Sequence, residues 1–315
     1  MSAIKKIRAE GQPVLVVDSG DLLFDAAIAT ANLSKARAKA KVIARAYKAV
    51  GVTAINVGEG DLLAGVKFLQ QGIGQRLPFI SANLVDSVRK KPIFTPFVIE
   101  EVSGIRIAFF GLVNPSIALA SKQGKAEEVT AADPVETARQ VVKELAGKAD
   151  LIILLSDLGV DEDTRIAKAC PGIHFILGGH EGRYVKAPYQ EGETFIVQSY
   201  QKGMYVGKLT LTMEKAGLPF HDEGKAEGIQ EKLNELERKI GTMQQARAKN
   251  PSPDIEKIID RLKQDRTRLQ AEIEQARQAA SRDNHFLWTL VPLFSSLPED
   301  AEVNQWIKRA GITGD

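Results

Sequence analysis

Five residues whose side chains could bind a metal ion or move a proton follow short apolar runs in the first two thirds of the chain. They are Asp21, Glu59, Asp61, Asp157 and His180. Carboxylates and imidazole are ligands for hard or borderline divalent cations. Taken singly, an acidic residue after a strand is more often a helix cap or turn residue than a ligand. The metal interpretation therefore requires that these side chains converge.

The apolar runs predict the buried strands of an α/β domain, because they are rich in valine and isoleucine and alternate with amphipathic helical segments. Apolar residues recur at helical spacing between Ala36 and Val50, and a second helix begins at the Asp-Pro start signal Asp133–Pro134. The carboxyl ends of parallel strands meet at one edge of a sheet, so we expect the site there. Residues 194–213 predict an antiparallel hairpin that closes the domain. The strand runs are PVLVVD, TAINVG, LPFISANL, RIAFFGL, DLIILLSDLG and HFILGGH.

The composition changes between about Glu227 and Ala280, where strand formers become rare and Glu, Lys, Arg and Gln become dense. Apolar residues keep a four-three spacing on both sides of Pro251 and Pro253, which would break a continuous helix. We predict an antiparallel coiled-coil hairpin over 223–283, with Arg266 at an expected apolar position. It serves either as a spacer or packing arm or as a contact for a protein partner or a second copy. Residues 284–315 are predicted to form a helical tail that docks on the main domain, 1–222.

The overall composition excludes few function classes. The 315 residues include 42 basic and 40 acidic side chains, so the net charge of +2 does not indicate nucleic acid or a membrane as the partner. No apolar run approaches the about 18 residues of a membrane span, and no signal peptide is visible. Cys170 is the single cysteine, which excludes an internal disulfide and is expected to be a buried small residue. The six basic residues between Lys35 and Lys48 are expected on a solvated helix face.

The motifs in order resemble the 5'-nucleotidase branch of the calcineurin-like metallophosphoesterases. The resemblance covers about residues 13–213 and is carried by VVDSGDLL, NVGEGDLLAG, ISANLVD, RIAFFGLVNP, LIILLSDLGVDED, FILGGHEGR and IVQSYQKGMYVGKLTL. It implies a four-layer sandwich in which two mixed β-sheets are flanked by helices. It also implies a centre of divalent metal ions that activates water to attack a phosphate ester.

The resemblance also assigns roles to individual positions. Asp21 matches the aspartate that bridges two metals. The family's G-N-H-E motif falls on residues 58–61, so a metal-binding Asn becomes Glu59 and the catalytic His becomes Gly60. Asp157 stands where the family has a metal-binding His, and His180 matches the first His of the family's G-H-x-[HQ] motif. The set implied for one metal is therefore Asp21, Glu59, Asp157 and His180, with Asp61 as a catalytic acid/base or supporting residue.

Other departures narrow what the resemblance implies. The family begins with a strand ending in D-x-H, and no such strand precedes Pro13, so the chain is expected to be an N-terminally incomplete and degenerate member. The second ligand of the G-H-x-[HQ] motif becomes Gly182. The family's C-terminal domain, whose aromatic residues stack on a nucleoside base, has no counterpart in the sequence.

Two functions remain open at this point. The first is hydrolysis of a small phosphorylated substrate, as in nucleotide catabolism, with Mn, Fe, Mg, Ca or Zn as the cofactor and with weak or altered activity because Gly60 replaces the catalytic His. The second is a non-catalytic module that binds a metal or a protein partner and retains the fold. The resemblance suggests a periplasmic or exported location.

Overall fold

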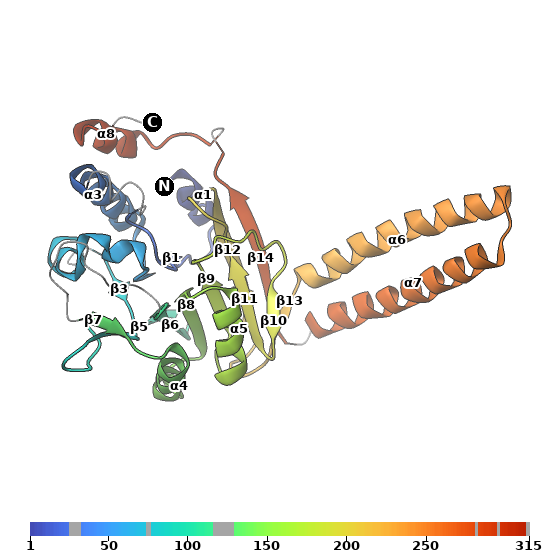
Figure 1. Cartoon of the computed structure of the whole chain (residues 1–315), viewed down its shortest axis with the longest axis horizontal. Coiled ribbons are helices and arrows are strands. Elements are labelled where there is room, and N and C mark those ends of the chain that lie inside the picture. The colour runs from blue at the N-terminus through green and yellow to red at the C-terminus, as the bar shows by residue number, and fades with distance from the viewer. Residues whose placement is uncertain (25–32, 74–76, 116–128, 281–282, 295–296, 313–315) are drawn as a thin grey trace. The chain divides into compact units, whose positions relative to one another are not determined.

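The computed structural model describes residues 1–24, 33–73, 77–115, 129–280, 283–294 and 297–312. The chain divides into two compact units. The first comprises Met1–Val185, Tyr189–Gly207 and Leu290–Asp315, and the second comprises Lys186–Pro188 and Lys208–Thr289. The helices and strands of both units are labelled in Figure 1.

A six-stranded mixed sheet forms the centre of the first unit. Four inner strands, β6, β8, β9 and β11, run parallel, and the edge strands β10 and β5 pair antiparallel. Every residue of β8 is buried, as expected for a central strand covered on both faces, and β8 ends in Asp157. In spatial order the strands are β10 (Tyr189–Glu191), β11 (Thr194–Gln198), β9 (Phe175–Gly178), β8 (Leu151–Asp157), β6 (Ile105–Val113) and β5 (Phe97–Val102).

A smaller parallel sheet packs against this one. Its strands are β1 (Val17–Asp18), β2 (Ala54–Asn56) and β3 (Phe79–Ile80). Strand β2 contacts β6 and β8, and the buried Asn56 amide donates to the carbonyl oxygens of Ser19 and Leu112 at 3.0 and 2.8 Å. A separate antiparallel pair is formed by β4 (Leu84–Asp86) and β7 (Val129–Ala131). The carboxyl ends of β1, β2 and β8 are thereby brought together.

Helices cover the outer faces of both sheets. Helix α3 (Leu33–Val50) buries a row of alanines, Ala36, Ala40 and Ala44, in one core with Ile55 of β2. Helices α4 (Pro134–Leu145) and α5 (Val160–Ala169) pack on β6 and β8 in a second core. This order of helix, sheet, sheet and helix confirms the predicted four-layer α/β sandwich, and the elements can be followed in Figure 1.

Four short elements complete the first unit. Helix α8 (Ala301–Arg309) contacts α3, where the Arg45 guanidinium lies 4.2 Å from the ring centre of Trp306. Helix α1 (Ser2–Arg8) is joined to α8 by an ion pair of 2.7 Å between Lys5 and Asp300. A 3-10 turn, η1 (Gly60–Ala64), and a π-helical turn, η2 (Phe68–Ile73), follow β2. In the described part of the chain, no helix has the length and apolar character needed to span a bilayer.

The second unit contains the predicted pair of long helices. Helix α6 (Gly224–Lys249) and helix α7 (Pro253–Ala280) pack antiparallel, because Ile229 and Leu233 near the start of α6 share a core with Leu269 and Ile273 near the end of α7. The coiled-coil geometry of this pair and the boundaries 223–283 remain predictions; residues 281–282 lie outside the described ranges.

Two sequence predictions differ from the structure. Residues 284–292 form strand β14 (Asn284–Pro292) where a helical tail was predicted, because the alternate side chains of Asn284, Phe286 and Trp288 are buried. The predicted hairpin over 194–213 is also wrong. Strand β11 pairs with β9 and β10, whereas β12 (Tyr205–Thr212) joins β14 and β13 (Phe220–Asp222) in another sheet.

Candidate metal centre

The loop after β1 brings Asp21 against the loop after β2 and the end of β8. Ser19 donates its hydroxyl to the carbonyl oxygen of Leu177 in β9 at 2.7 Å. Gly20 has a φ of +115°, and a Cβ atom there would lie 3.0 Å from the backbone of Gly58 and 3.4 Å from the Cβ atom of Asp157. Only glycine permits this close approach without strain, so the sequence Ser-Gly-Asp sets the position of the Asp21 carboxylate.

Asp61 anchors two of these loops from inside the protein. Its fully buried carboxylate accepts hydrogen bonds from the backbone N–H groups of Asp21, Leu23 and Gly58 at 3.1, 2.8 and 3.0 Å. Burial raises the pKa of Asp61 to about 8, against the lowering effect of the Gly58 and Leu23 N–H groups. The side chain predicted as a catalytic acid/base therefore lies where it positions Asp21.

Three of the predicted ligands converge. Asp21, Asp157 and His180 each offer a ligand atom, and these atoms all lie within 4.8 Å of one another. His180 follows β9 by two residues, and its Nδ1 atom lies 3.3 Å from Oδ1 of Asp157. Backbone groups fix the two carboxylates, because Glu59 N–H donates to Asp157 at 3.0 Å and Gly60 N–H donates to Asp21 at 2.6 Å.

The electrostatics of this group suit a divalent cation. Burial raises the pKa of Asp157 to about 6. The hydrogen bond to Asp157 raises the pKa of His180 to about 9, with further contributions from the negative charges of Asp21 and Glu59. Between these values the pair is an imidazolium beside a carboxylate, with a second carboxylate in reach. Two carboxylates and an imidazole around one point form a donor set that fits a divalent metal, which would take the place of the imidazolium proton.

Glu59 lies beside this group but not in it. Its side chain is exposed and is not among the three that share the 4.8 Å cluster, although its charge reaches His180. The backbone of Glu59, through its N–H bond to Asp157, is the part that contacts the centre.

The two glycines that replace family residues are tightly packed. A Cβ atom on Gly60 would lie 2.8 Å from the carbonyl oxygen of Phe24 and 3.1 Å from Oδ1 of Asp21. Gly182 has a φ of +59°, and a Cβ atom there would lie 2.6 Å from the Cβ atom of Gln201. In this conformation neither position has room for a larger side chain.

Asp163 is a supporting residue that the sequence motifs did not indicate. Asp163 in α5 is fully buried, accepts a hydrogen bond from the Ser156 hydroxyl, and has its pKa raised to about 7 by burial. Ser156 precedes Asp157 in β8, so Asp163 supports the end of that strand. The signal was an aspartate at the helical spacing of the buried residues Val160 and Ile166.

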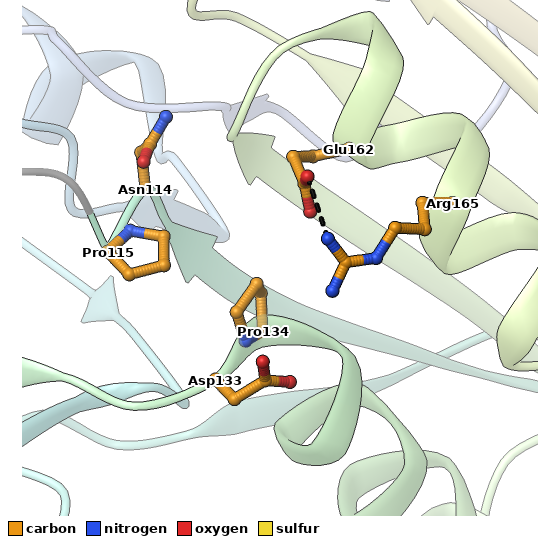
Figure 2. A pocket seen from close by; sticks show the side chains of 6 residues that line it. All are labelled: Asn114, Pro115, Asp133, Pro134, Glu162 and Arg165. Carbon is orange, nitrogen blue, oxygen red and sulfur yellow. Dashed lines mark hydrogen bonds and ion pairs between the residues drawn. The ribbon is translucent and has the colours of Figure 1, made fainter.

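A separate hollow of about 280 Å³ lies between the end of β6 and the starts of α4 and α5 (Figure 2). Its charged groups are already engaged: Arg165 pairs with Glu162 at 3.0 Å, and Asp133 caps α4 by accepting from the Glu136 N–H at 2.8 Å. The residues that line it are Asn114, Pro115, Asp133, Pro134, Glu162 and Arg165, none of which belongs to the metal group.

Comparisons with known proteins bear on the family and the fold of the chain. No protein-family model matches the chain. The chain is 28% identical over 201 residues to the 2',3'-cyclic-nucleotide 2'-phosphodiesterase/3'-nucleotidase of Salmonella typhimurium, covering 57% of this chain and 31% of that protein. It is 28% identical over 234 residues to the 5'-nucleotidase of Vibrio cholerae, covering 64% and 41%. The chain thus spans less than half the length of these curated relatives.

Solved structures show the same fold. The calcineurin-like phosphoesterase YfkN from Bacillus subtilis superposes with a TM-score of 0.63 at 18% identity, over 98% of this chain and 86% of that one. In sequence and fold, the chain is therefore a relative of the 5'-nucleotidase-like, calcineurin-type metallophosphoesterases, whose name implies a divalent metal cofactor.

Proposed function

We propose that this relative of the 5'-nucleotidase-like metallophosphoesterases is a metal-dependent phosphoester hydrolase of reduced activity. The observation that carries the proposal is the convergence of Asp21, Asp157 and His180 at the carboxyl ends of three strands. Relatives named for nucleotide substrates favour a nucleotide-like phosphate ester. An exported location and a partner or second copy bound through the α6–α7 pair belong to the same proposal.

In this proposal Asp21, Asp157 and His180 would hold the metal, and Glu59 would join them only if its exposed side chain turned toward the group. A bound divalent ion supplies Lewis acidity and lowers the pKa of a coordinated water. The chain's own residues do the positioning. Asp61 holds the Asp21 loop through three N–H groups, and the Glu59 and Gly60 N–H groups orient the two carboxylates.

The reduced activity follows from Gly60. The position that the resemblance assigns to the catalytic His has no side chain, and a Cβ atom there would lie 2.8 Å from the Phe24 carbonyl oxygen. A general acid or electrostatic stabiliser contributes about 10²–10⁴-fold to a rate, and this contribution is missing. The same observation favours the second candidate function, a metal-binding module that keeps the fold without turnover.

The test combines metal binding with turnover. Titration calorimetry with Mn²⁺ and hydrolysis of 4-nitrophenyl phosphate are measured for the wild type, His180→Ala and His221→Ala. His221 is a matched control, because it also pairs with an aspartate, Asp283, at 2.9 Å but lies in the second unit. We expect stoichiometric binding and slow turnover in the wild type and in His221→Ala, and loss of both in His180→Ala.

The outcomes separate the two candidates. Binding that depends on His180 without turnover above buffer supports the non-catalytic module. Absence of binding in the wild type, or equal losses in both histidine variants, contradicts a metal centre at Asp21, Asp157 and His180. Because His180 is one-third exposed, its removal is not expected to unfold the protein, and circular dichroism checks this.

A further inference from the structure

A row of three residues crosses the carboxyl ends of three neighbouring parallel strands. Ser156 of β8 is the register partner of Gly178 in β9, and Gly178 is the register partner of Gln198 in β11. Residues in one such row point to the same face of the sheet, here the face covered by α5, which contacts β9 and β11 (Figure 1). The residue after Ser156 is Asp157, and its side chain points to the opposite face. The row therefore lies back to back with a predicted metal ligand.

Asp163 of α5 occupies the place above the glycine in this row. Its carboxylate accepts a hydrogen bond from the Ser156 hydroxyl through Oδ1. A Cβ atom on Gly178 would lie 2.9 Å from Oδ2 of Asp163 and 2.7 Å from Nε2 of Gln198. Both polar atoms thus border the space that a side chain at this position would fill.

These two atoms are buried without a partner. Oδ2 of Asp163 and Nε2 of Gln198 have no hydrogen-bond partner among the described residues. The Asp163 side chain is fully buried, and Gln198 is 2% exposed. One atom is an acceptor and the other a donor, and a buried polar group that stays unsatisfied costs stability. The arrangement therefore favours a hydrogen bond between them, formed by a small rotation of either side chain.

The other end of the Gln198 side chain reaches the loop that carries His180. Its Oε1 atom accepts a hydrogen bond from the Arg183 N–H at 3.0 Å. The same loop touches the start of α5, because a Cβ atom on Gly159 would lie 2.9 Å from Oε1 of Glu181. Helix α5 is thus in contact both with the end of β8 and with the loop after β9.

We propose that Gln198 donates a hydrogen bond to Asp163 above Gly178 and that these two side chains position the metal centre. The resulting network connects the end of β8 to the loop after β9. It thereby sets the distance between Asp157 and His180, whose Oδ1 and Nδ1 atoms lie 3.3 Å apart. Both residues act through their neighbours, so they are positioning residues and not ligands. This proposal rests on the function proposed above.

The experiment exchanges the donor and the acceptor. In Asp163→Asn, the new amide nitrogen faces the amide nitrogen of Gln198, so two donors oppose each other. Asp163→Asn together with Gln198→Glu puts the donor and the acceptor in each other's places and leaves the net charge unchanged. One oxygen at each position still accepts from Ser156 or Arg183 in this double variant. Gly178→Ala is a second way to break the contact, since its methyl group would separate the two side chains.

Two quantities are measured: Mn²⁺ affinity by titration calorimetry and, in the metal-free protein, hydrogen exchange of the Arg183 amide by NMR. We expect Asp163→Asn and Gly178→Ala to weaken Mn²⁺ binding about tenfold, as loss of a supporting group around a metal site does. The Arg183 amide should exchange about tenfold faster, as the loss of one buried hydrogen bond implies. The double variant restores both values. Thr194→Val is the matched control, because it removes a buried hydrogen bond of 2.6 Å to the Ile173 carbonyl oxygen at the other end of β11, and it should change neither.

Three results would overturn the proposal: Asp163→Asn with unchanged Mn²⁺ affinity and unchanged Arg183 exchange, a double variant that recovers neither, or equal losses in Thr194→Val. Each would show that Asp163 stabilises the fold without positioning the centre. The exchange measurement separates this proposal from the one on which it rests. A wild type that binds no Mn²⁺ contradicts the proposed function, whereas loss and recovery of Arg183 protection in that same protein supports the network.

Discussion

Two histidine–aspartate pairs in this protein look alike in their direct contact and differ in everything around it. His180 lies 3.3 Å from Asp157 in the first unit, and His221 lies 2.9 Å from Asp283 in the second. Both imidazoles are 32% exposed, but the Asp157 side chain is 1% exposed and the Asp283 side chain 29%. Among the described residues, only the first pair has a third ligand, Asp21, within 4.8 Å.

The difference shows that the surroundings of a histidine–carboxylate pair decide what it can do. Asp157 ends a central strand and accepts a hydrogen bond from the Glu59 N–H at 3.0 Å, so its carboxylate is held in place by the backbone. His221 and its register partner His285 lie on the paired strands β13 and β14, and each pairs with a carboxylate of its own, Asp283 or Glu223. Among the described residues, neither of these two pairs belongs to a group of three ligand atoms within 4.8 Å of one another.

The largest effect on stability is expected from removing the Asp61 carboxylate, which holds the loops around the His180–Asp157 pair and has no counterpart at the His221–Asp283 pair. Asp61→Ala leaves three backbone N–H groups, those of Asp21, Leu23 and Gly58, without their acceptor. Each buried unsatisfied donor costs about 1–3 kcal/mol, so we expect the free energy of unfolding of the first unit to fall by at least about 3 kcal/mol. The control Asp283→Ala is expected to cost at most about 1 kcal/mol.

The measurement is urea denaturation followed by the fluorescence of Trp306, which lies in the first unit, in a Trp288→Phe background common to all variants. Equal losses in Asp61→Ala and Asp283→Ala would show that the Asp61 network has no special role, and would remove the main structural difference between the two pairs.

Periodic patterns predicted the α/β class and the polar residues at strand ends, whereas the four-layer sandwich and the candidate ligand set came from the family resemblance. Buried strands alternate with helices, and in a parallel arrangement their polar ends must meet, which is why Asp21, Asp157 and His180 lie together. The orientation of an exposed side chain follows no such pattern. Glu59 was therefore predicted as a ligand although its side chain lies outside the group of three.

The parts that escaped prediction depend on contacts between distant segments. Strands β13 and β14 are paired, but helices α6 and α7 separate them in the sequence. The alternating burial of β14 depends on this pairing, which the local sequence does not indicate. The burial of Asp61 requires the Asp21 loop to lie against it, forty residues away in the sequence.

A rise in pH is expected to strengthen metal binding at the His180–Asp157 pair and to weaken the stability of the metal-free protein. His180 must lose its proton to bind a metal, and its pKa is raised to about 9. The neutral fraction therefore grows about tenfold per pH unit below that value, and we expect Mn²⁺ affinity to rise about 100-fold from pH 6.5 to 8.5.

In the metal-free protein, a rise in pH is expected to lower the stability of the fold. The folded state holds the His180 proton more tightly than the unfolded state, so this contribution to stability is fully present below about pH 6.5 and is lost as the pH rises through 9. Asp61, with its pKa raised to about 8, acts in the same direction. Thermal unfolding of the metal-free protein should show a falling melting temperature over this range; a rising one would mean that the His180–Asp157 contact does not form in solution.

The smallest expected effect concerns Glu59, the predicted ligand that stays outside the cluster. Its exposed carboxylate must change rotamer to reach the metal, and the ordering of a free side chain offsets part of the gain. We expect Glu59→Ala to weaken Mn²⁺ binding by about tenfold, a loss comparable to that of a supporting group around a metal site. Glu223→Ala, which removes the carboxylate beside His285, serves as the control and should change nothing. A Glu59→Ala variant with unchanged affinity would reduce the centre to Asp21, Asp157 and His180, and would assign Glu59 only the backbone N–H that holds Asp157.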